Sequence, residues 1–284
     1  MKISSKIYLA IAAFLVIGAV FFAVSYNSDN GKERIIVAVD ENPPYTYTTA
    51  PVAAYFDESS DNAGKTATAL KFQGFDIDVI MAVADRAGLA IEFRDVPFAD
   101  MLNQMARPPK QPTNFIQRYF AKKSDLDLAI GGISITAARK IFAEFTIPYA
   151  SGGACIVALK SGPVTSPESL SGKLVGVELA TTNMDTAAKI SGAKLKFYRD
   201  QQSLLLDLLN GVVNAIVIDR IAAAFYITER KLEQLKIVNL ADEEEFAMLA
   251  RKGNTKLIDK INKALNEMKA SGELQKLHDK WFSR

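Results

Sequence analysis

The sequence predicts an α/β protein, and three observations support that prediction. Short runs of β-branched and other apolar residues, typical of buried strands, alternate with segments in which apolar residues recur at helical spacing. Glycine ends several of the helical segments. The chain has 284 residues, which is enough for one large domain or two medium ones.

The predicted strands are the short apolar runs. They comprise residues 35–39, 91–96, 128–130, 154–159, 174–178, 195–198, 215–218, 237–238 and 246–250. The predicted helices comprise residues 74–87, 203–209, 254–269 and 274–282, and further helices begin at Pro97, shortly before Arg139, at Thr182 and after Asp219.

Two of these helices show why the pattern is helical. In residues 74–87 the apolar side chains stand at positions 79, 80, 83 and 87, and acidic residues in the first turn suit the helix dipole. In residues 254–269 the apolar positions are 257, 261, 265 and 268, and Gly272 ends the helix. Each helix should therefore place one face against a core.

The composition excludes several classes of function. The formal net charge is +2, and loss of the first 25 residues would leave zero, so nucleic-acid binding has no electrostatic support. The single cysteine, Cys155, cannot form an internal disulfide, and we expect it to be a small buried apolar residue. One histidine, His278, argues against a histidine metal cluster or a serine–histidine triad. No cofactor or metal is predicted.

The N-terminus predicts export from the cytoplasm. Lys2 and Lys6 precede an unbroken apolar run over residues 7–24, which is typical of a signal peptide. Ala23-Val24-Ser25 offers a cleavage site between small residues, and we favour cleavage. The run is also just long enough to span a bilayer, so a retained anchor over residues 7–24 is the alternative. In both cases the rest of the chain is expected to be periplasmic or otherwise extracytoplasmic.

The stretch over residues 127–149 has the features of an anion site. A short strand ends at Gly131-Gly132, and Ser134, Thr136 and Arg139 follow. Glycines let the backbone approach a ligand closely, and a Ser or Thr at a helix start leaves N–H groups that attract a carboxylate. Arginine adds a two-pronged, charge-assisted clamp. On this stretch alone, a strand–turn–helix with a surface arginine is an equally good interpretation.

This stretch resembles the signature of periplasmic solute-binding proteins of polar amino-acid ABC transporters. In that family the motif Gly-x-(Ser/Thr)-x-Thr-x-x-Arg holds the α-carboxylate and part of the α-amino group of the ligand, and Gly132, Ser134 and Arg139 occupy its positions. The resemblance covers residues 34–282 and implies the two-lobe, type II periplasmic-binding-protein fold, with two crossing strands. Lobe 1 would comprise residues 34–149 and 248–284, lobe 2 residues 150–247, and residues 1–25 the signal peptide or anchor.

The resemblance also implies ligand contacts from lobe 1. Asp40 stands at the end of a strand, and Tyr45 follows the turn after it; in relatives such residues touch the ligand side chain. Phe98 matches an aromatic residue that covers the ligand. The alternatives are a turn or cap for Asp40, hinge or core packing for Tyr45 and a core position for Phe98.

Lobe 2 should supply the remaining contacts. Thr182 falls where relatives donate a backbone N–H to the carboxylate, and Glu178 falls where side-chain specificity is often set. Asp219 matches an aspartate that takes the ammonium group of the ligand, and the C-terminal edge of a strand faces the crevice where open α/β sheets bind ligands. The alternatives are an exposed strand end for Glu178 and a helix N-cap for Asp219.

The chain departs from the family in three places. The family usually has Gly-Thr where this chain has Ala180-Thr181, so the backbone is less permissive there. Residues 48–71 and 107–124 are longer than usual and are interpreted as surface loops without a readable role.

The predicted function is capture of an amino acid between the lobes. Asp40 and Glu178 favour a cationic side chain, so arginine, lysine or ornithine is preferred to glutamine. The expected partner is an ABC-transporter permease, with a monomeric protein and no nucleic acid. An exported cyclohexadienyl dehydratase, an enzyme of the same fold that also has Thr-Asn at positions like Thr182-Asn183, is the alternative. A sensing domain of a receptor would need further domains.

Overall fold

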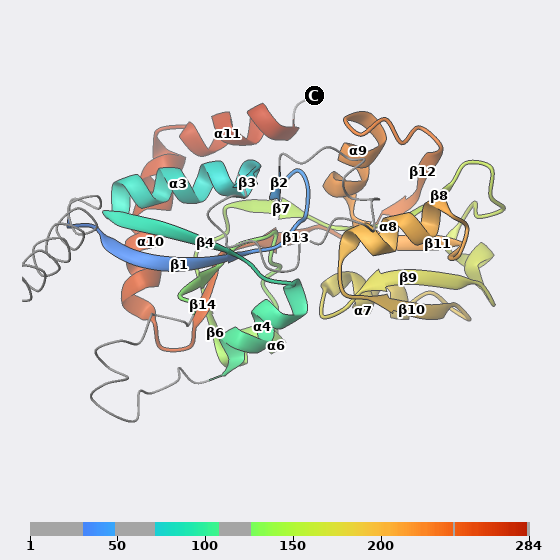
Figure 1. Ribbon diagram of the computed structural model, residues 1–284, viewed down its shortest axis with the longest axis horizontal. Coiled ribbons are helices and arrows are strands. Elements are labelled where there is room, and N and C mark those ends of the chain that lie inside the picture. The colour runs from blue at the N-terminus through green and yellow to red at the C-terminus, as the bar shows by residue number, and fades with distance from the viewer. Residues whose placement is uncertain (1–30, 49–71, 108–125, 241, 283–284) are drawn as a thin grey trace, which may run out of the picture.

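The computed structural model describes residues 31–48, 72–107, 126–240 and 242–282. In these residues two mixed five-stranded sheets lie side by side, each with helices on both faces (Figure 1), which confirms the α/β class. The predicted signal peptide or anchor lies outside the described residues. So do nearly all residues of the loops predicted over residues 48–71 and 107–124. In the part of the chain that is described, no helix is both long enough and apolar enough to cross a membrane.

The first sheet and its helices form what we call lobe 1. Its strand order is β4 (Leu89–Asp95), β1 (Glu33–Val39), β5 (Leu128–Ala129), β14 (Leu249–Arg251) and β6 (Ala143–Phe145). Strand β1 is parallel to β4 and β5, whereas β14 is antiparallel to β5 and β6. The helices are α3 (Phe75–Ala87), α4 (Phe98–Ala106), α6 (Ala137–Phe142), α10 (Thr255–Ala270) and α11 (Glu273–Phe282).

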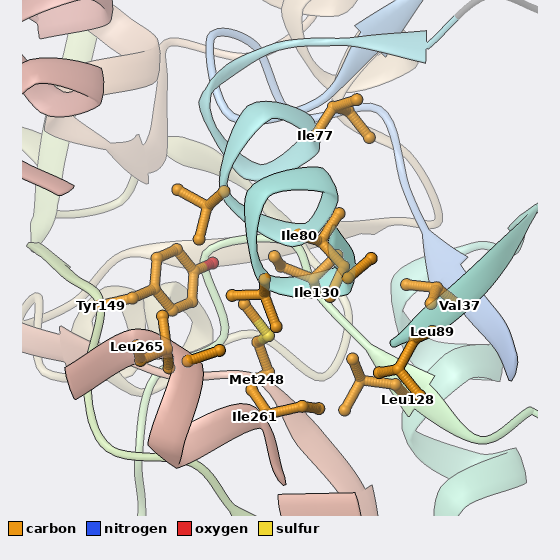
Figure 2. Close-up of a cluster of buried hydrophobic side chains, with 14 of the residues drawn as sticks. Val37, Ile77, Ile80, Leu89, Leu128, Ile130, Tyr149, Met248, Ile261 and Leu265 are labelled. Atoms are coloured by element: carbon orange, nitrogen blue, oxygen red, sulfur yellow. The ribbon is translucent and has the colours of Figure 1, made fainter. Parts of the chain in front are cut away.

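Strand β1 is buried on both faces, because helices cover both sides of the sheet. Successive side chains of a strand point to opposite faces. Val37 therefore packs with α3 and α10, in the cluster that Figure 2 shows around Ile80 and Ile261. Ile36 packs on the other face with residues of α4. The continuous apolar run of this strand is thus the pattern of a central parallel strand.

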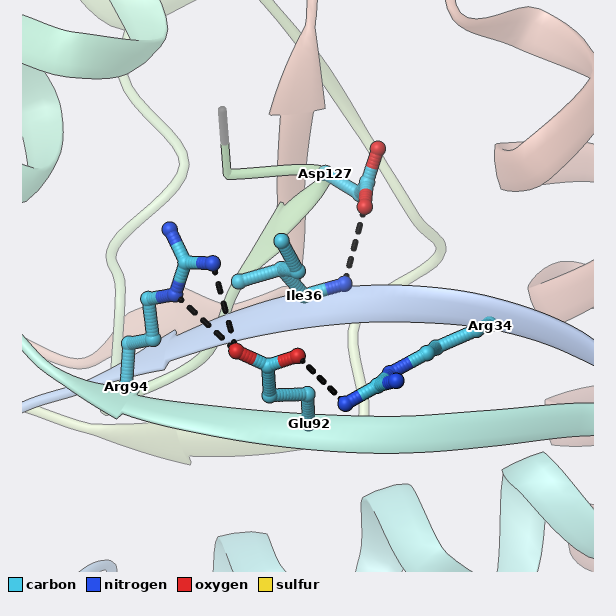
Figure 3. A network of polar contacts seen from close by, with 5 residues as sticks. All are labelled: Arg34, Ile36, Glu92, Arg94 and Asp127. Carbon is cyan, nitrogen blue, oxygen red and sulfur yellow. Dashed lines mark hydrogen bonds and ion pairs between the residues drawn. The ribbon is translucent and has the colours of Figure 1, made fainter. Parts of the chain in front are cut away.

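Polar contacts beside β1 fix the start of the stretch that carries Arg139 (Figure 3). The carboxylate of Asp127 accepts a hydrogen bond from the backbone N–H of Ile36 at 2.8 Å, one residue before β5 begins. On the neighbouring strand β4, Glu92 accepts from Arg34 at 2.8 Å and from the Arg94 guanidinium at 3.2 Å. The Asp127 contact ties the chain that enters the site to the middle of the sheet.

The second sheet and its helices form lobe 2. Its strand order is β10 (Lys194–Tyr198), β9 (Leu174–Glu178), β11 (Ala215–Asp219), β8 (Ala154–Leu159) and β12 (Leu235–Leu240). The helices are η1 (Pro167–Leu170), α7 (Thr182–Ala188), α8 (Gln201–Leu209) and α9 (Arg220–Thr228). Cys155 of β8 is buried among apolar residues, and burial raises the pKa of its thiol to about 12.

Two short strands connect the lobes. Strand β7 (Ala150–Gly152) leads from lobe 1 into lobe 2, and β13 (Glu244–Phe246) leads back and pairs with β7 in antiparallel fashion. The single strand predicted over residues 246–250 is therefore wrong, because β13 ends at Phe246 and β14 begins at Leu249. The apolar pattern runs through both strands, but the chain changes its pairing partner between them, which local periodicity does not record.

A two-stranded sheet follows the turn after β1. Strands β2 (Tyr47–Thr48) and β3 (Phe72–Gln73) are antiparallel and bring together the two ends of the predicted inserted loop. Gly74 follows them with φ of 134° and lies against the turn before β2, where an added Cβ would come within 2.8 Å of the Pro44 carbonyl oxygen. Only glycine fits this approach without displacing the turn.

Candidate functional site

A cavity lies between the two lobes at the crossing strands. Its lining includes eight of the nine predicted residues: Asp40, Phe98, Gly132, Ser134, Arg139, Glu178, Thr182 and Asp219. They come from the ends of strands and the starts of helices in both lobes. Segments that are far apart in the sequence thus contribute to one concave site with several charged groups, as expected of a pocket for a small polar ligand.

Arg139 is the cationic group of the cavity and comes from α6. Thr136 caps this helix, since its hydroxyl accepts from the Arg139 N–H at 3.1 Å. The guanidinium donates to the backbone carbonyl of Ser134 at 2.8 Å and, across the cavity, to that of Ala180 at 3.0 Å. Its Cζ lies 5.3 Å from the centre of the Phe98 ring, within cation–π range. The side chain is buried, so the surface-arginine interpretation is wrong.

Burial lowers the pKa of Arg139 to about 10, while the charges of Glu244 and Asp185 oppose that change. The guanidinium therefore remains protonated at neutral pH. A buried guanidinium that is protonated at neutral pH and has planar donor geometry is well suited to hold a carboxylate.

Asp219 caps a helix, as one interpretation of this residue expected, and it also lines the cavity, whereas its contact with a ligand stays a prediction. It ends β11 and accepts from the N–H groups of Ile221 at 2.8 Å and Ala222 at 3.2 Å, in the first turn of α9. It also accepts from the Gly153 N–H at 3.1 Å. Burial raises the pKa of this carboxyl group, and the hydrogen bonds oppose that change.

Tyr45 is the one predicted residue that does not line the cavity. Its side chain is fully buried, and its hydroxyl donates to Asp219 Oδ1 at 3.2 Å. Its ring packs against Phe246 and Phe282, with ring centres 5.7 Å and 5.5 Å away. The structure thus places Tyr45 behind Asp219, where it fixes the orientation of that carboxylate.

Asp40 and Glu178 place two further carboxyl groups in the cavity, one from each lobe. Asp40 accepts from the N–H groups of Glu41 at 2.8 Å and Phe98 at 2.7 Å. Burial raises the pKa of Asp40 to about 7. Glu178 is buried rather than exposed, and burial, followed by the charges of Asp40 and Asp200, raises its pKa well above the usual value. A cation placed between these groups would stabilise both ionised forms.

Comparison with known proteins is decisive for the family. The family model described as bacterial extracellular solute-binding proteins, family 3, matches residues 110–284. The chain belongs to this family. A second model, described as the ligated ion channel L-glutamate- and glycine-binding site, matches residues 33–162.

Several relatives of this family 3 solute-binding protein are similar over most of their length. The arginine-binding extracellular protein ArtP of Bacillus subtilis is 26% identical over 261 residues, which cover 90% of this chain and 89% of ArtP. A probable histidine-binding protein of Neisseria gonorrhoeae is 26% identical over 269 residues, 92% of each chain. An ancestral arginine-binding protein bound to arginine has a TM-score of 0.70 at 30% identity, covering 88% of this chain and 99% of that one. The resemblance and the two-lobe fold predicted from the sequence are confirmed.

Gly132 of this solute-binding protein is held by Asp76, a residue in the first turn of α3. Gly132 has φ of 61°, and its N–H donates to Asp76 Oδ2 at 3.1 Å. The other oxygen of Asp76 accepts from the Tyr149 hydroxyl at 2.9 Å. Asp76 is fully buried, and burial raises its pKa to about 7. The first turn of α3 therefore fixes the glycine loop beside Arg139.

Ala180, where the resemblance predicts glycine, has a left-handed backbone. Its φ is 65°, in the left-handed region, and its carbonyl oxygen accepts the hydrogen bond from Arg139. The turn between β9 and α7 therefore has a conformation that alanine rarely adopts.

Several further residues of the cavity were not predicted as ligand contacts, among them Asn42, Gln201, Glu244 and Phe246. Gln201 begins α8 and joins the lobes, because its amide donates to Asn42 Oδ1 at 3.3 Å. Phe246 and Glu244 lie on β13, one of the two strands that connect the lobes. None of these residues belongs to a motif, and a helix start or a crossing segment by itself gives no sign of cavity contact.

Proposed function

We propose that this protein captures an α-amino acid with a cationic side chain, namely arginine, lysine or ornithine, and delivers it to an ABC-transporter permease. Export would place it outside the cytoplasm, as the apolar run over residues 7–24 predicts. The B. subtilis relative named as an arginine-binding protein and the ancestral protein bound to arginine support this ligand class.

The proposed binding of the amino-acid head group uses opposite charges from the two lobes. Arg139 of lobe 1 would hold the carboxylate, with Gly132 and the backbone at Thr182 beside it, and Asp219 of lobe 2 would hold the ammonium. Each lobe by itself would make only part of these contacts. Binding would therefore favour the arrangement in which the lobes meet, because the ligand interacts more strongly with that state.

The preference for a cationic side chain rests on one observation, the pair of buried carboxyl groups of Asp40 and Glu178 in the same cavity. A neutral side chain such as that of glutamine leaves both carboxyl groups to be protonated or to repel each other. A guanidinium or ammonium group would favour their ionised forms. The structure therefore favours arginine, lysine or ornithine.

Titration calorimetry with ornithine and each of the twenty amino acids tests the proposal. We expect tight binding of the cationic amino acids and weak or no binding of the others. The variant Arg139→Met should weaken binding about thirtyfold or more, because charge-assisted hydrogen bonds contribute about 2–3 kcal/mol. Lys140→Met is the matched control, since Lys140 follows on the same helix and is exposed. Tight glutamine binding without arginine binding would exclude the cationic preference.

The dehydratase alternative keeps one structural point in its favour, since Thr182 and Asn183 both line the cavity. Incubation of the protein with prephenate or arogenate distinguishes the two functions. Formation of phenylpyruvate or phenylalanine at an enzymatic rate would replace the transport proposal with an elimination reaction. We expect no turnover, and we expect neither compound to compete with arginine.

A further inference from the structure

Glu244 lies at the place where the crossing strand, lobe 1 and lobe 2 meet. On β13, Glu244 and Phe246 line the cavity, whereas Glu245 between them is exposed, as the two-residue period of a strand requires. The strand is held on both sides. It pairs with β7 on one side, and on the other the Ile135 N–H donates to the Glu245 carbonyl at 3.0 Å.

The carboxylate of Glu244 determines the direction of a short chain of hydrogen bonds. The Thr182 hydroxyl donates to Glu244 Oε2 at 2.8 Å, and the Ser134 hydroxyl oxygen lies 3.2 Å from that of Thr182. A hydroxyl group has one proton, and an ionised carboxylate only accepts. Thr182 therefore gives its proton to Glu244, and Ser134 must give its own to Thr182. The Ser134 and Thr182 hydroxyls are then left with lone pairs, not protons, for a ligand.

Asp219 by itself has too few free lone pairs to accept every hydrogen bond that an ammonium group can donate. A carboxylate has about four lone-pair sites. Asp219 already accepts from Tyr45, Gly153, Ile221 and Ala222, and three of these donors share Oδ1. An α-ammonium group has three N–H donors, so it requires acceptors other than Asp219 in the same cavity. The Ser134 and Thr182 hydroxyls are acceptors that line this cavity.

We propose that Glu244 is a positioning residue that makes the Ser134–Thr182 hydroxyl pair an acceptor for the ammonium group of the ligand. The carboxylate of the ligand is then left to Arg139 and to backbone N–H groups. This inference rests on the proposed function and adds to it the residue that fixes the orientation of the head group.

The test compares L-arginine with 5-guanidinopentanoate, which lacks only the α-amino group. The wild-type protein should prefer arginine. In Glu244→Gln the amide can donate as well as accept, so the hydroxyl pair can reverse its direction. Loss of one hydrogen bond of about 1 kcal/mol corresponds to about a fivefold fall in the preference for arginine. Calorimetry measures both affinities.

Glu245→Gln is the matched control, because it makes the same change on the same strand at an exposed position and should leave the preference unchanged. In a Thr182→Val background, Glu244→Gln should cause no further fall in the preference, because the hydrogen-bond chain is already broken. Thermal denaturation shows whether each variant folds. If Glu244→Gln does not fold, Thr182→Val alone must lower the preference.

Three results would overturn the inference. In the first, Glu244→Gln weakens both ligands equally, as a general structural role would predict. In the second, the preference does not change, and in the third, the Glu245 variant lowers it to the same extent. A wild-type protein that binds no amino acid would instead overturn the proposed function, and the wild-type titration alone reveals that outcome.

Discussion

At the scale of single residues, burial gives the Asp40 carboxyl group properties that its residue type does not suggest. Its pKa is about 7 in the folded protein, compared with the usual 3.8, and the charges of Asp95 and Asp200 add to the effect of burial. Burial, followed by the charge of Asp40, also raises the pKa of Glu178 in the same cavity. The folded protein thus holds the proton of the Asp40 carboxyl group more tightly than the unfolded chain does.

This shift predicts how stability depends on pH. The stabilisation from a proton with a raised folded-state pKa is fully present below pH 3.8 and is lost as the pH rises through about 7. Without ligand, the free energy of unfolding should therefore fall over this range, and it should fall less steeply in Asp40→Asn. Urea denaturation at several pH values measures the slope. Because the pKa of Asp76 is also about 7, part of this pH dependence of stability should remain in Asp40→Asn.

Binding of a cationic amino acid should show the opposite trend, because a cation favours ionised Asp40. Affinity should rise as the pH rises through about 7, with release of protons, and Asp40→Asn should remove much of this rise. Calorimetry in buffers of different ionisation enthalpy detects the protons. The same pH dependence in the variant and in the wild type would show that Asp40 does not face the bound cation.

Ala180 gives a second residue-scale prediction. A left-handed backbone is unfavourable for alanine by about 1–2 kcal/mol, whereas glycine adopts it readily. Ala180→Gly should therefore raise the free energy of unfolding by about 1 kcal/mol. Ala224→Gly should lower it by about the same amount, since Ala224 is exposed in the middle of helix α9. Denaturation with urea measures both, and equal destabilisation by the two changes would contradict the assigned backbone strain.

At the scale of the element, the crossing strand β7 passes so close to the site that it accepts no side chain at Gly152. A Cβ there would lie 2.5 Å from Asp219 Oδ2 and would also overlap the ring of Phe246. Gly152→Ala should destabilise the protein by about 1–3 kcal/mol and weaken amino-acid binding, because Asp219 or Phe246 must move.

Thermal denaturation and calorimetry check this prediction. Gly131→Ala is the control for stability, because an added Cβ at Gly131 meets no atom within 4 Å. Its free energy of unfolding should stay within about 0.5 kcal/mol of the wild type. A Gly152→Ala protein with unchanged stability and affinity would mean that the crossing strand is free to move away from Asp219.

The elements also show where periodicity succeeds and where it fails. Helix α3 was predicted to begin at residue 74 and begins at Phe75, because apolar spacing and acidic residues mark it locally. The run at residues 246–250 was predicted as one strand and forms parts of two. A strand forms only with a pairing partner. Here β13 pairs with β7 and β14 pairs with β6, and both partners lie about a hundred residues earlier in the chain.

At the scale of the whole molecule, the cavity exists only because two lobes are in contact across it. Arg139 of lobe 1 donates to the carbonyl of Ala180 in lobe 2, and Tyr45 of lobe 1 donates to Asp219 of lobe 2, which is 174 residues away in the sequence. These contacts, with the Ser134–Thr182 pair, place the charged residues of both lobes around one cavity. We propose that the boundaries between the lobes fall after residues 149 and 247, at the two crossing strands.

The sequence by itself determined the α/β class, most of the strands and helices, the family and eight of the residues that line the cavity. It could do so because helices and strands follow local apolar periodicity, and because the residues around Arg139 form a compact motif. These features need no knowledge of the partner segment.

Only the tertiary structure decided the roles of Tyr45, Asp76, Gln201 and Glu244. Tyr45 was expected beside the ligand but lies behind Asp219, and Glu244 belongs to no motif yet directs two hydroxyl groups. A hydrogen bond between distant segments depends on how the sheets and crossing strands are placed in space. Because local residue patterns do not encode that placement, these roles became visible only in the folded chain.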